Sequence, residues 1–142
     1  MLKGFRFVHP VEVRFRDLDA LGHVNNAVYL TYLESARLAY WLQVTGLRDL
    51  AAMNVILARA EVDYRSPVGY GERLEVGVRC ASIRRSSLAL EQAIVEAGSG
   101  RLVAEARKIL VYYDYAAQRP LAIPDELRQK LRAQDPGLSL EV

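Results

Sequence analysis

The sequence predicts an α+β protein in which one antiparallel sheet wraps around a single long helix. Three observations predict this class. Apolar and polar residues alternate with a period of two in several separate segments, which is typical of strands. Residues 27–45 have the period of a helix instead, with apolar side chains on more than one side, so this helix is expected to be widely covered. The later strand segments follow one another without helices between them, which favours antiparallel pairing.

The first strand and the long helix are separated by a polar turn. Residues 5–15 carry apolar side chains at odd positions, and Pro10 among them marks a sheet edge or a bulge. Asn25 or Asn26 can cap the start of the helix, because an asparagine side chain can accept a hydrogen bond from a free backbone amide. Gly46 follows the expected end of the helix, where glycine is favoured.

The second half of the chain contains four strand segments and a short helix. The predicted strands are residues 56–64, 74–80, 88–97 and 101–115. A Gly-Ser-Gly turn at residues 98–100 predicts a hairpin, and the four strands are expected to form a meander. In the last strand the apolar phase changes from even to odd positions, which predicts a bulge near Arg107 and Lys108. A short amphipathic helix is expected to start at Pro124.

Length and composition predict one globular domain covering residues 1–142, with a mass of 16.0 kDa. The formal net charge of +2 does not call for a nucleic-acid partner. The sequence has neither an apolar run long enough for a membrane span nor the continuous apolar segment of a secretory signal. The single cysteine, Cys80, excludes an intramolecular disulfide and fits a reducing compartment, so a cytoplasmic location is expected.

Several kinds of chemistry can be set aside. The sequence has no G-x-S-x-G nucleophile motif. The stretch Gly69-Tyr70-Gly71 lacks a third glycine and precedes a strand, so it is not a dinucleotide fingerprint. Two histidines and one cysteine without ligand-like spacing make a metal site improbable, and none is expected. Catalysis must then use carboxylates, amides and backbone dipoles.

The polar segment between the first strand and the helix is the best candidate site. Asp17 and Asp19 lie there, and either could simply shape the turn or cap the helix. The functional alternative is that one carboxylate faces a reacting carbonyl, while the first amides of the helix act as an oxyanion hole. Such a sparse site suits a thioester, because a thiolate leaving group needs little protonation. An amide would also need a matched general acid.

These residues resemble a known family. The stretch DLDALGHVNN, residues 17–26, is followed by further matching residues: Tyr29, Tyr32, Glu34, Ala36 and Arg37. The pattern resembles the hot-dog-fold acyl-CoA thioesterases, most closely the 4-hydroxybenzoyl-CoA thioesterase branch and the thioesterases of the Tol–Pal gene cluster. The order of elements is similar too, over roughly residues 6–132. The resemblance implies a hot-dog fold, in which the sheet wraps around the central helix.

The resemblance also implies which residues form the site. The catalytic carboxylate of the family falls on Asp19, and its backbone donor at the helix start falls on the amide of Asn26. Gly22 matches the glycine of the intervening turn, and His23 is expected to orient the loop or the substrate. Some relatives carry histidine or tyrosine where this chain has Asn26, so the Asn26 side chain is not assigned a catalytic role.

Three other polar residues of the motif are assigned support rather than catalysis: Asp17, Glu34 and Arg37. Glu34 and Arg37 are three positions apart on the expected helix, so they could pair with each other at its surface.

A second cluster lies between two of the predicted strands. Relatives place a basic run that contacts the nucleotide phosphates of coenzyme A at the position of four residues here: Arg84, Arg85, Ser86 and Ser87. Arginines suit such contacts because the guanidinium group binds phosphate with two parallel hydrogen bonds. The alternative interpretation is a solvated, charged turn without a ligand.

The resulting hypothesis is a cytoplasmic acyl-CoA thioesterase in which Asp19 acts as nucleophile or as general base toward water. No cofactor is expected, because coenzyme A is part of the substrate. The family also implies homodimers joined edge to edge, or homotetramers made of two such dimers, with sites formed between two subunits. Two alternatives stay open: a hot-dog hydratase or dehydratase, which usually needs a histidine on the helix, and a non-catalytic acyl-CoA-binding module.

Overall fold

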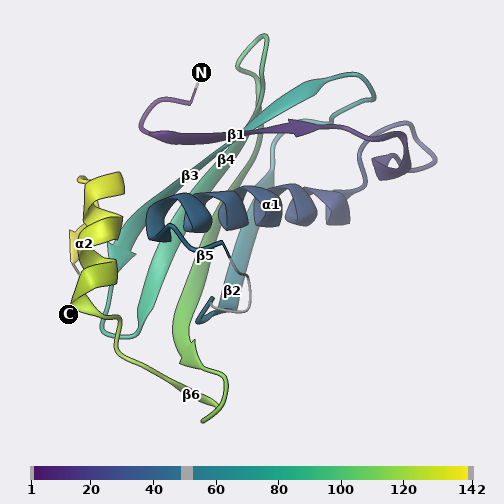
Figure 1. Cartoon of the computed structure of the whole chain (residues 1–142). Coiled ribbons are helices and arrows are strands. Elements are labelled where there is room, and N and C mark those ends of the chain that lie inside the picture. The colour runs from purple at the N-terminus through teal and green to yellow at the C-terminus, as the bar shows by residue number, and fades with distance from the viewer. Residues whose placement is uncertain (1, 49–52, 141–142) are drawn as a thin grey trace.

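The computed structural model describes residues 2–48 and 53–140 (Figure 1). Its helices are η1 (Phe15–Asp17), α1 (Asn26–Thr45) and α2 (Asp125–Gln134). Its strands are β1 (Phe7–Glu12), β2 (Val55–Tyr64), β3 (Arg73–Ile83), β4 (Ser87–Glu96), β5 (Leu102–Asp114), β6 (Arg119–Pro120) and β7 (Ser139–Leu140). The long helix α1 crosses one face of the sheet, and α2 lies beside the end of the sheet reached by β3 (Figure 1). The predicted α+β class is confirmed.

The five long strands have the order β1-β3-β4-β5-β2. The predicted meander holds for β3, β4 and β5, but β2 pairs with β5 and not with its sequence neighbour β3. The physical reason is that the other edge of β3 is already occupied by β1, which pairs with it antiparallel. Pro10 lies in β1, at one edge of the five, so the predicted edge position is confirmed.

Helix α1 begins and ends as the sequence predicts. Asn25 is its N-cap, and the side chain of Asn25 accepts a hydrogen bond from the amide of Ala27 at 2.9 Å. Gly46 ends the helix with a φ of 72°, a left-handed conformation that glycine adopts without strain. The helix packs mainly against β1 and β3. Leu33 and Tyr40 are fully buried, and burial of a leucine side chain such as Leu33 stabilises the fold by roughly 1.5–3 kcal/mol.

The predicted bulge near Arg107 and Lys108 is wrong. At Arg107 and Lys108 themselves β5 pairs regularly with both neighbours. Its register with β4 shifts opposite Ile94 and Val95, and its register with β2 shifts between Leu57 and Arg59, where the extra residue belongs to β2. The apolar phase misled because Lys108 is not a surface residue. It lies on the same face as Ala106 and Leu110 and is only 2% exposed, so a buried lysine interrupts the apolar series.

A buried carboxylate, that of Asp135, connects the C-terminal helix α2 to the core by hydrogen bonds. Asp135, just after α2, accepts hydrogen bonds from the hydroxyl of Tyr40 at 2.5 Å and from the amide of Cys80 at 2.9 Å. Burial, and then the nearby Asp135 charge, raise the pKa of the Cys80 thiol to about 12. Cys80 is therefore an inert core residue.

Strand β2 is the other edge of the five-strand series, and most of its side chains are exposed. Its exposed large apolar residues include Ile56, Leu57 and Tyr64. An edge strand of this length and composition is a template for pairing with another chain. Among the described helices, none is long and apolar enough to cross a membrane.

Candidate functional site

The first aspartate of the motif is part of the framework. The carboxylate of Asp17 is 2% exposed and accepts hydrogen bonds from Tyr32 at 2.6 Å and from the Arg14 guanidinium at 2.9 Å. Burial alone would raise the pKa of Asp17, but the hydrogen bonds from Arg14 and Tyr32 outweigh it, so the pKa lies below its usual value. Because Tyr32 belongs to α1, this carboxylate fixes the loop against the helix. The supporting role expected for Asp17 fits this environment.

The second aspartate has the opposite environment. Asp19 is exposed, and its Oδ1 accepts hydrogen bonds from the amides of Leu21 at 2.9 Å and His23 at 3.4 Å. Its Oδ2 accepts no hydrogen bond from any residue within 2–48 or 53–140. Gly22 makes the tight turn possible, because its φ is 79° and its amide donates to the Asp19 carbonyl at 3.1 Å. One carboxylate oxygen is thus held by the turn while the other is available.

His23 takes part in this turn through its backbone. Its carbonyl accepts a hydrogen bond from the amide of Asp19 at 2.8 Å, and it forms a bridge with Gly69. The His23 side chain is exposed and hydrogen-bonds to no described residue. Next to it, the amide of Val24 donates to the Val68 carbonyl at 2.8 Å, which anchors the loop to the segment before β3.

As far as the described residues go, the helix N-terminus presents one free amide near this loop. Asn25 satisfies the next two amides, since its side chain accepts from Ala27 and its carbonyl accepts from Val28 at 2.9 Å. The amide of Asn26 donates to no acceptor in the described part of the chain. The Asn26 carbonyl accepts a hydrogen bond from Tyr64 at 2.9 Å, which joins the helix start to the end of β2. A free N–H at the positive end of a helix is the donor that an oxyanion needs.

The expected surface pair of Glu34 and Arg37 does not form. No ion pair joins these two described side chains, although the charge of Glu34 influences the Arg37 guanidinium at longer range. Burial lowers the pKa of Arg37, and its Nε is buried without a hydrogen-bond partner in the described structure. Arg37 is partly buried, and its charge acts on Lys108 of β5.

The predicted nucleotide-binding residues form the tight turn between β3 and β4. The amide of Arg84 donates to the Ser87 carbonyl at 2.8 Å, and the Ser86 carbonyl accepts from the amide of Tyr112 at 2.8 Å. The Arg85 side chain is exposed, as is that of Arg84. The Arg128 guanidinium of α2 donates to the carbonyls of both arginines, at 2.7 and 3.0 Å, which fixes the turn.

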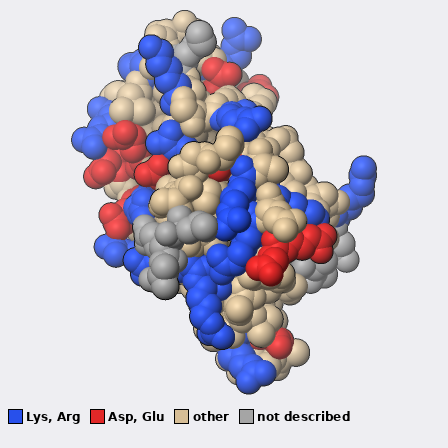
Figure 2. Space-filling model, turned by 90° about the vertical axis from the view of Figure 1, so that its left-hand side faces the viewer, with Lys and Arg blue, Asp and Glu red and all other residues tan. Residues whose placement is uncertain are grey.

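Two cations near this turn are not assigned to the binding site from the sequence: Arg59 is too weak a candidate from sequence alone, and Arg107 is not among the candidates. Arg59 and Arg107 line a hollow of about 280 Å³ together with Arg84, Ser82 and Ser87. These residues come from β2, β3, β4, β5 and the turn between β3 and β4, so the pairing of these strands brings them together. A side view toward α2 also shows a band of Lys and Arg side chains with fewer acidic ones (Figure 2).

The two predicted clusters lie at opposite ends of the sheet within one chain. Glu12, at the end of β1 that leads to Asp19, pairs with Arg73 at the start of β3. Arg84 follows the end of β3, eleven positions later, which is about 36 Å along a strand at about 3.3 Å per residue. The segment that leads to the Asp19 loop and the Arg84 turn therefore lie at opposite ends of β3 within one chain.

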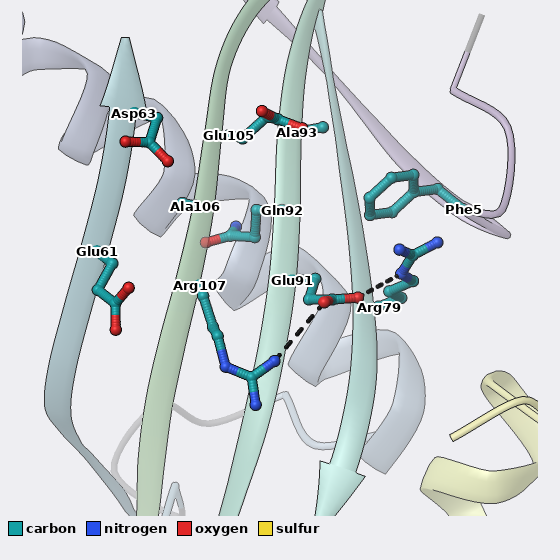
Figure 3. A pocket seen from close by; sticks show the side chains of 10 residues that line it. All are labelled: Phe5, Glu61, Asp63, Arg79, Glu91, Gln92, Ala93, Glu105, Ala106 and Arg107. Atoms are coloured by element: carbon teal, nitrogen blue, oxygen red, sulfur yellow. Dashed lines mark hydrogen bonds and ion pairs between the residues drawn. The ribbon is translucent and has the colours of Figure 1, made fainter. Parts of the chain in front are cut away.

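A hollow of about 300 Å³ on the sheet face opposite α1 is not part of this site. Figure 3 shows Arg79 and Arg107 on either side of Glu91, in a row of alternating charge. Glu91 accepts a hydrogen bond from Arg79 at 2.9 Å and forms an ion pair with Arg107 at 3.6 Å. Mutually compensated charges of this kind are typical of a solvated sheet face.

The antiparallel sheet around α1, with the Asp19 turn and a free amide at the helix start, is the arrangement expected of a hot-dog thioesterase. Comparison with known proteins agrees on the family. Residues 13–131 match the family model of the thioesterase-like superfamily. The chain is 32% identical over 123 residues to the long-chain acyl-CoA thioesterase FadM of Escherichia coli, covering 85% of this chain and 93% of FadM. It is 29% identical to the acyl-CoA thioester hydrolase YbgC of Shigella flexneri, over 85% and 92% of the two chains.

A solved structure gives the same result. A thioesterase from Thermus thermophilus, crystallised with coenzyme A and zinc, superposes with a TM-score of 0.86 at 39% identity, covering 95% of this chain and 98% of the other. The chain belongs to the thioesterase-like superfamily, and its hot-dog fold is confirmed. The predicted family, 4-hydroxybenzoyl-CoA-type acyl-CoA thioesterase, is confirmed at the level of hot-dog acyl-CoA thioesterases.

Proposed function

We propose that this protein hydrolyses acyl-CoA thioesters with the carboxylate of Asp19 and the backbone amide of Asn26. Its family and its relatives make it a thioester hydrolase of the acyl-CoA type. One observation carries the assignment of residues. Among the described residues, the loop and helix start present one free carboxylate oxygen and one free helical amide, while the Asp17 carboxylate and the amides of Ala27 and Val28 are already paired.

The reaction needs only these two groups. The Asn26 amide and the positive end of α1 would stabilise the oxygen that becomes negative as the carbonyl is attacked. Asp19 would either attack the carbonyl and form an anhydride, or remove a proton from the attacking water. The thiolate then leaves without strong protonation, since a thiol has a pKa of about 8.5. The proposed reaction takes no cofactor, and coenzyme A enters only as part of the substrate.

The test is release of free thiol from a panel of acyl-CoAs by the wild type and by Asp19→Ala. We expect the variant to lose turnover by at least about a hundredfold while it still folds and binds substrate. Asp114→Ala is a matched control, because Asp114 also uses Oδ1 to accept two turn amides, those of Ala116 and Ala117. Equal activity in Asp19→Ala and the wild type would contradict the assignment. Binding of acyl-CoAs without any hydrolysis by the wild type would favour the binding module.

The two roles of Asp19 can be separated by oxygen-18 labelling. A single turnover in labelled water transfers the label to the Asp19 carboxylate only if that carboxylate attacks the thioester and water then attacks the aspartyl side of the anhydride. Label in Asp19 therefore establishes the nucleophilic route, whereas label found only in the released acid fits both the general-base role and attack of water on the acyl side of the anhydride.

A homodimer joined through β2 would complete the site. Antiparallel pairing of two β2 strands around a two-fold axis places the Tyr64 end of one strand beside the Val55 end of the other. The Tyr64 end carries Asn26 of its own chain through a hydrogen bond. The Val55 end lies beside Tyr112, whose amide holds the Arg84–Ser87 turn. The dimer would thus bring the catalytic loop of one chain to the nucleotide-binding turn of its partner.

In this dimer Arg84 and Arg85 would bind the nucleotide phosphates. Arg59 and Arg107 line the same hollow as Arg84, where they form ion pairs with Glu61 and Glu91 respectively. Replacing Arg84 and Arg85 by alanine should raise KM for CoA esters more than for short thioesters that lack the nucleotide. Equal effects on both substrates would contradict nucleotide binding. Two such dimers could form a tetramer, and light scattering of the purified protein would measure the assembly.

A mixing experiment tests whether the site is shared. Asp19→Ala protein is mixed, under conditions that exchange subunits, with protein carrying Arg84→Ala and Arg85→Ala. Each mixed dimer regains one intact site if the two clusters come from different chains, so about a quarter of all sites should recover after random pairing. Activity at low substrate concentration should rise above that of both parents. No recovery after demonstrated exchange would show that the clusters do not share a site.

A further inference from the structure

Two cations on the helix side of the sheet have no anionic partner among the residues that the structure describes. Lys108 of β5 is 2% exposed and forms neither a hydrogen bond nor an ion pair with the residues that the structure describes. Arg37 of α1 faces the same region, and its buried Nε is likewise unpartnered among residues 2–48 and 53–140. The exposed carboxylate of Glu34 influences both cations without forming an ion pair with either. Buried, unpaired charge is costly and indicates that an anion binds there.

An exposed apolar strip connects these cations with the candidate reaction centre. Residues directly opposite in paired strands point to the same face, so Leu57, Ala60 and Tyr64 of β2 share the helix side with their β5 partners. Leu57 and Tyr64 are nevertheless 45% and 46% exposed, because α1 packs mainly over β1 and β3. Leu30 of α1, one turn after Asn26, is 42% exposed beside this region.

The strip has a defined length. Tyr64 contacts Asn26 at one end, and Ala60 pairs with Lys108 four positions earlier in β2, about 13 Å away at about 3.3 Å per residue. Arg37 is eleven positions after Asn26 on the same helix, which is about 16 Å at 1.5 Å per residue. The two estimates agree, so both cations lie a similar distance from the free Asn26 amide.

We infer that this strip holds the acyl group of the thioester and that Arg37 and Lys108 bind an anionic oxygen group, such as a carboxylate, at its far end. The inference rests on the proposed thioesterase function and names its substrate class: acyl-CoAs whose acyl group ends in a second acid. Apolar side chains would contact the methylene chain, and the paired cations would form charge-assisted hydrogen bonds with the terminal oxygens.

Burial distinguishes this anion from the phosphates of coenzyme A. Arg84 and Arg85 are exposed, which suits a strongly hydrated phosphate. Lys108 and the Nε of Arg37 are withdrawn from water, which suits the single charge of a carboxylate. A carboxylate of a partner subunit is the competing occupant. The experiment below distinguishes an acyl carboxylate, a phosphate of coenzyme A and a partner's carboxylate.

The charge of the Lys108 side chain should make binding of a terminal carboxylate depend on pH. Burial, and then the charge of Arg37, lower the pKa of Lys108 to about 8, while Glu34 acts in the opposite direction. The strand neighbours opposite Lys108, Ala60 and Leu90, carry no charge. Lys108 is protonated below this pKa, so binding of a terminal carboxylate should be strong near pH 7 and weaken as the pH rises through about 8.

The test compares kcat/KM for a chain-length series of acyl-CoAs with that for the matching ω-carboxyacyl-CoAs. At the length that reaches Lys108, the wild type should favour the ω-carboxy substrate. Lys108→Met should lower that ratio at least tenfold while hydrolysing the uncharged substrates at least as well as the wild type. Lys130→Met, which removes an exposed lysine of α2, is the matched control and should leave the ratio unchanged. Arg37→Met serves as a second variant should Lys108→Met not fold.

Several outcomes would overturn the inference. Hydrolysis of uncharged acyl-CoAs without a preferred ω-carboxy length keeps the proposed function and rejects this inference, whereas no hydrolysis at all rejects the proposed function. Lys108→Met could leave the ratio of kcat/KM between ω-carboxy and uncharged substrates unchanged and instead dissociate the oligomer. The two cations would then bind a carboxylate of the partner subunit. If Lys108→Met impairs CoA thioesters but spares pantetheine thioesters lacking the nucleotide, the cations bind a phosphate instead.

Discussion

Asp17 and Asp19 lie two positions apart in one loop, yet their carboxylates have opposite surroundings. Asp17 is buried and receives hydrogen bonds from Arg14 and from Tyr32 of α1. Asp19 is exposed, and only one of its oxygens is held by the turn that it starts. The difference shows that two identical side chains have different roles. Asp17 fixes the loop on the helix, and the resulting rigidity positions the free oxygen of Asp19.

The largest effect should come from removing the charge of the free carboxylate. Asp19→Asn keeps the shape of the side chain and the oxygen that caps the turn, but it supplies neither a nucleophile nor a base. We expect kcat to fall by about 10²–10⁴-fold, with an unfolding free energy within about 0.5 kcal/mol of the wild type. Thiol release and urea denaturation measure the two quantities. A loss of stability large enough to account for the lost activity would mean that Asp19, like Asp17, fixes the loop and is not catalytic.

The bound carboxylate should show the reverse pattern. Asp17→Asn removes the charge that Arg14 and Tyr32 satisfy, so the unfolding free energy should fall by about 2–3 kcal/mol. Activity per folded molecule should fall less than in Asp19→Asn, and it should do so through kcat because the loop is less rigid. Urea denaturation followed by thiol release at full folding measures both. Unchanged stability would contradict the framework role.

Tyr32→Phe tests the contact between the loop and α1 alone. Asp17 keeps its hydrogen bonds to Arg14, so the expected loss of stability is smaller, about 1–2 kcal/mol. The phenylalanine ring still fills the buried position. Combining this change with Asp17→Asn in a double-mutant cycle should reveal a coupling energy of about 1 kcal/mol, and strict additivity would show that the hydrogen bond contributes nothing.

The pH dependence should show the smallest effect. Because the folded pKa of Asp17 is lowered, its stabilisation is fully present above the unfolded value of about 3.9 and is lost as the pH falls through the folded pKa. The difference in unfolding free energy between the wild type and Asp17→Asn should therefore be constant from pH 7 to about pH 5 and shrink below about pH 4. A difference that persists unchanged at pH 3 would point to packing instead of charge.

The sequence predicted the helix and strand segments well, because neighbouring residues largely determine where such a segment begins and ends. Asn25 and Gly46 act through their own backbone positions, so the limits of α1 could be predicted within a residue. The pairing of β2 with β5 could not, since it depends on which strand edge remains free after β1 joins β3. Lys108 was misplaced for a related reason: a period of two assumes that charges face water, and a buried lysine violates that assumption.

The same distinction between local and long-range causes applies to the candidate site. Asp19 and Asn26 belong to one short segment, so the sequence motif brings them together before any tertiary contact is known. Arg59 and Arg107 join Arg84 only through the register of three strands, and no spacing along the chain indicates that proximity.

The Arg128 guanidinium has a consequence for engineering the protein. It donates to three backbone carbonyls, those of Ile123, Arg84 and Arg85, and so joins α2 to the turn between β3 and β4. Lengthening that turn by even one residue would pull two of the three acceptors away from a single donor group. A label or tag placed there should loosen the C-terminal helix as well, although the two segments are about forty residues apart in the chain.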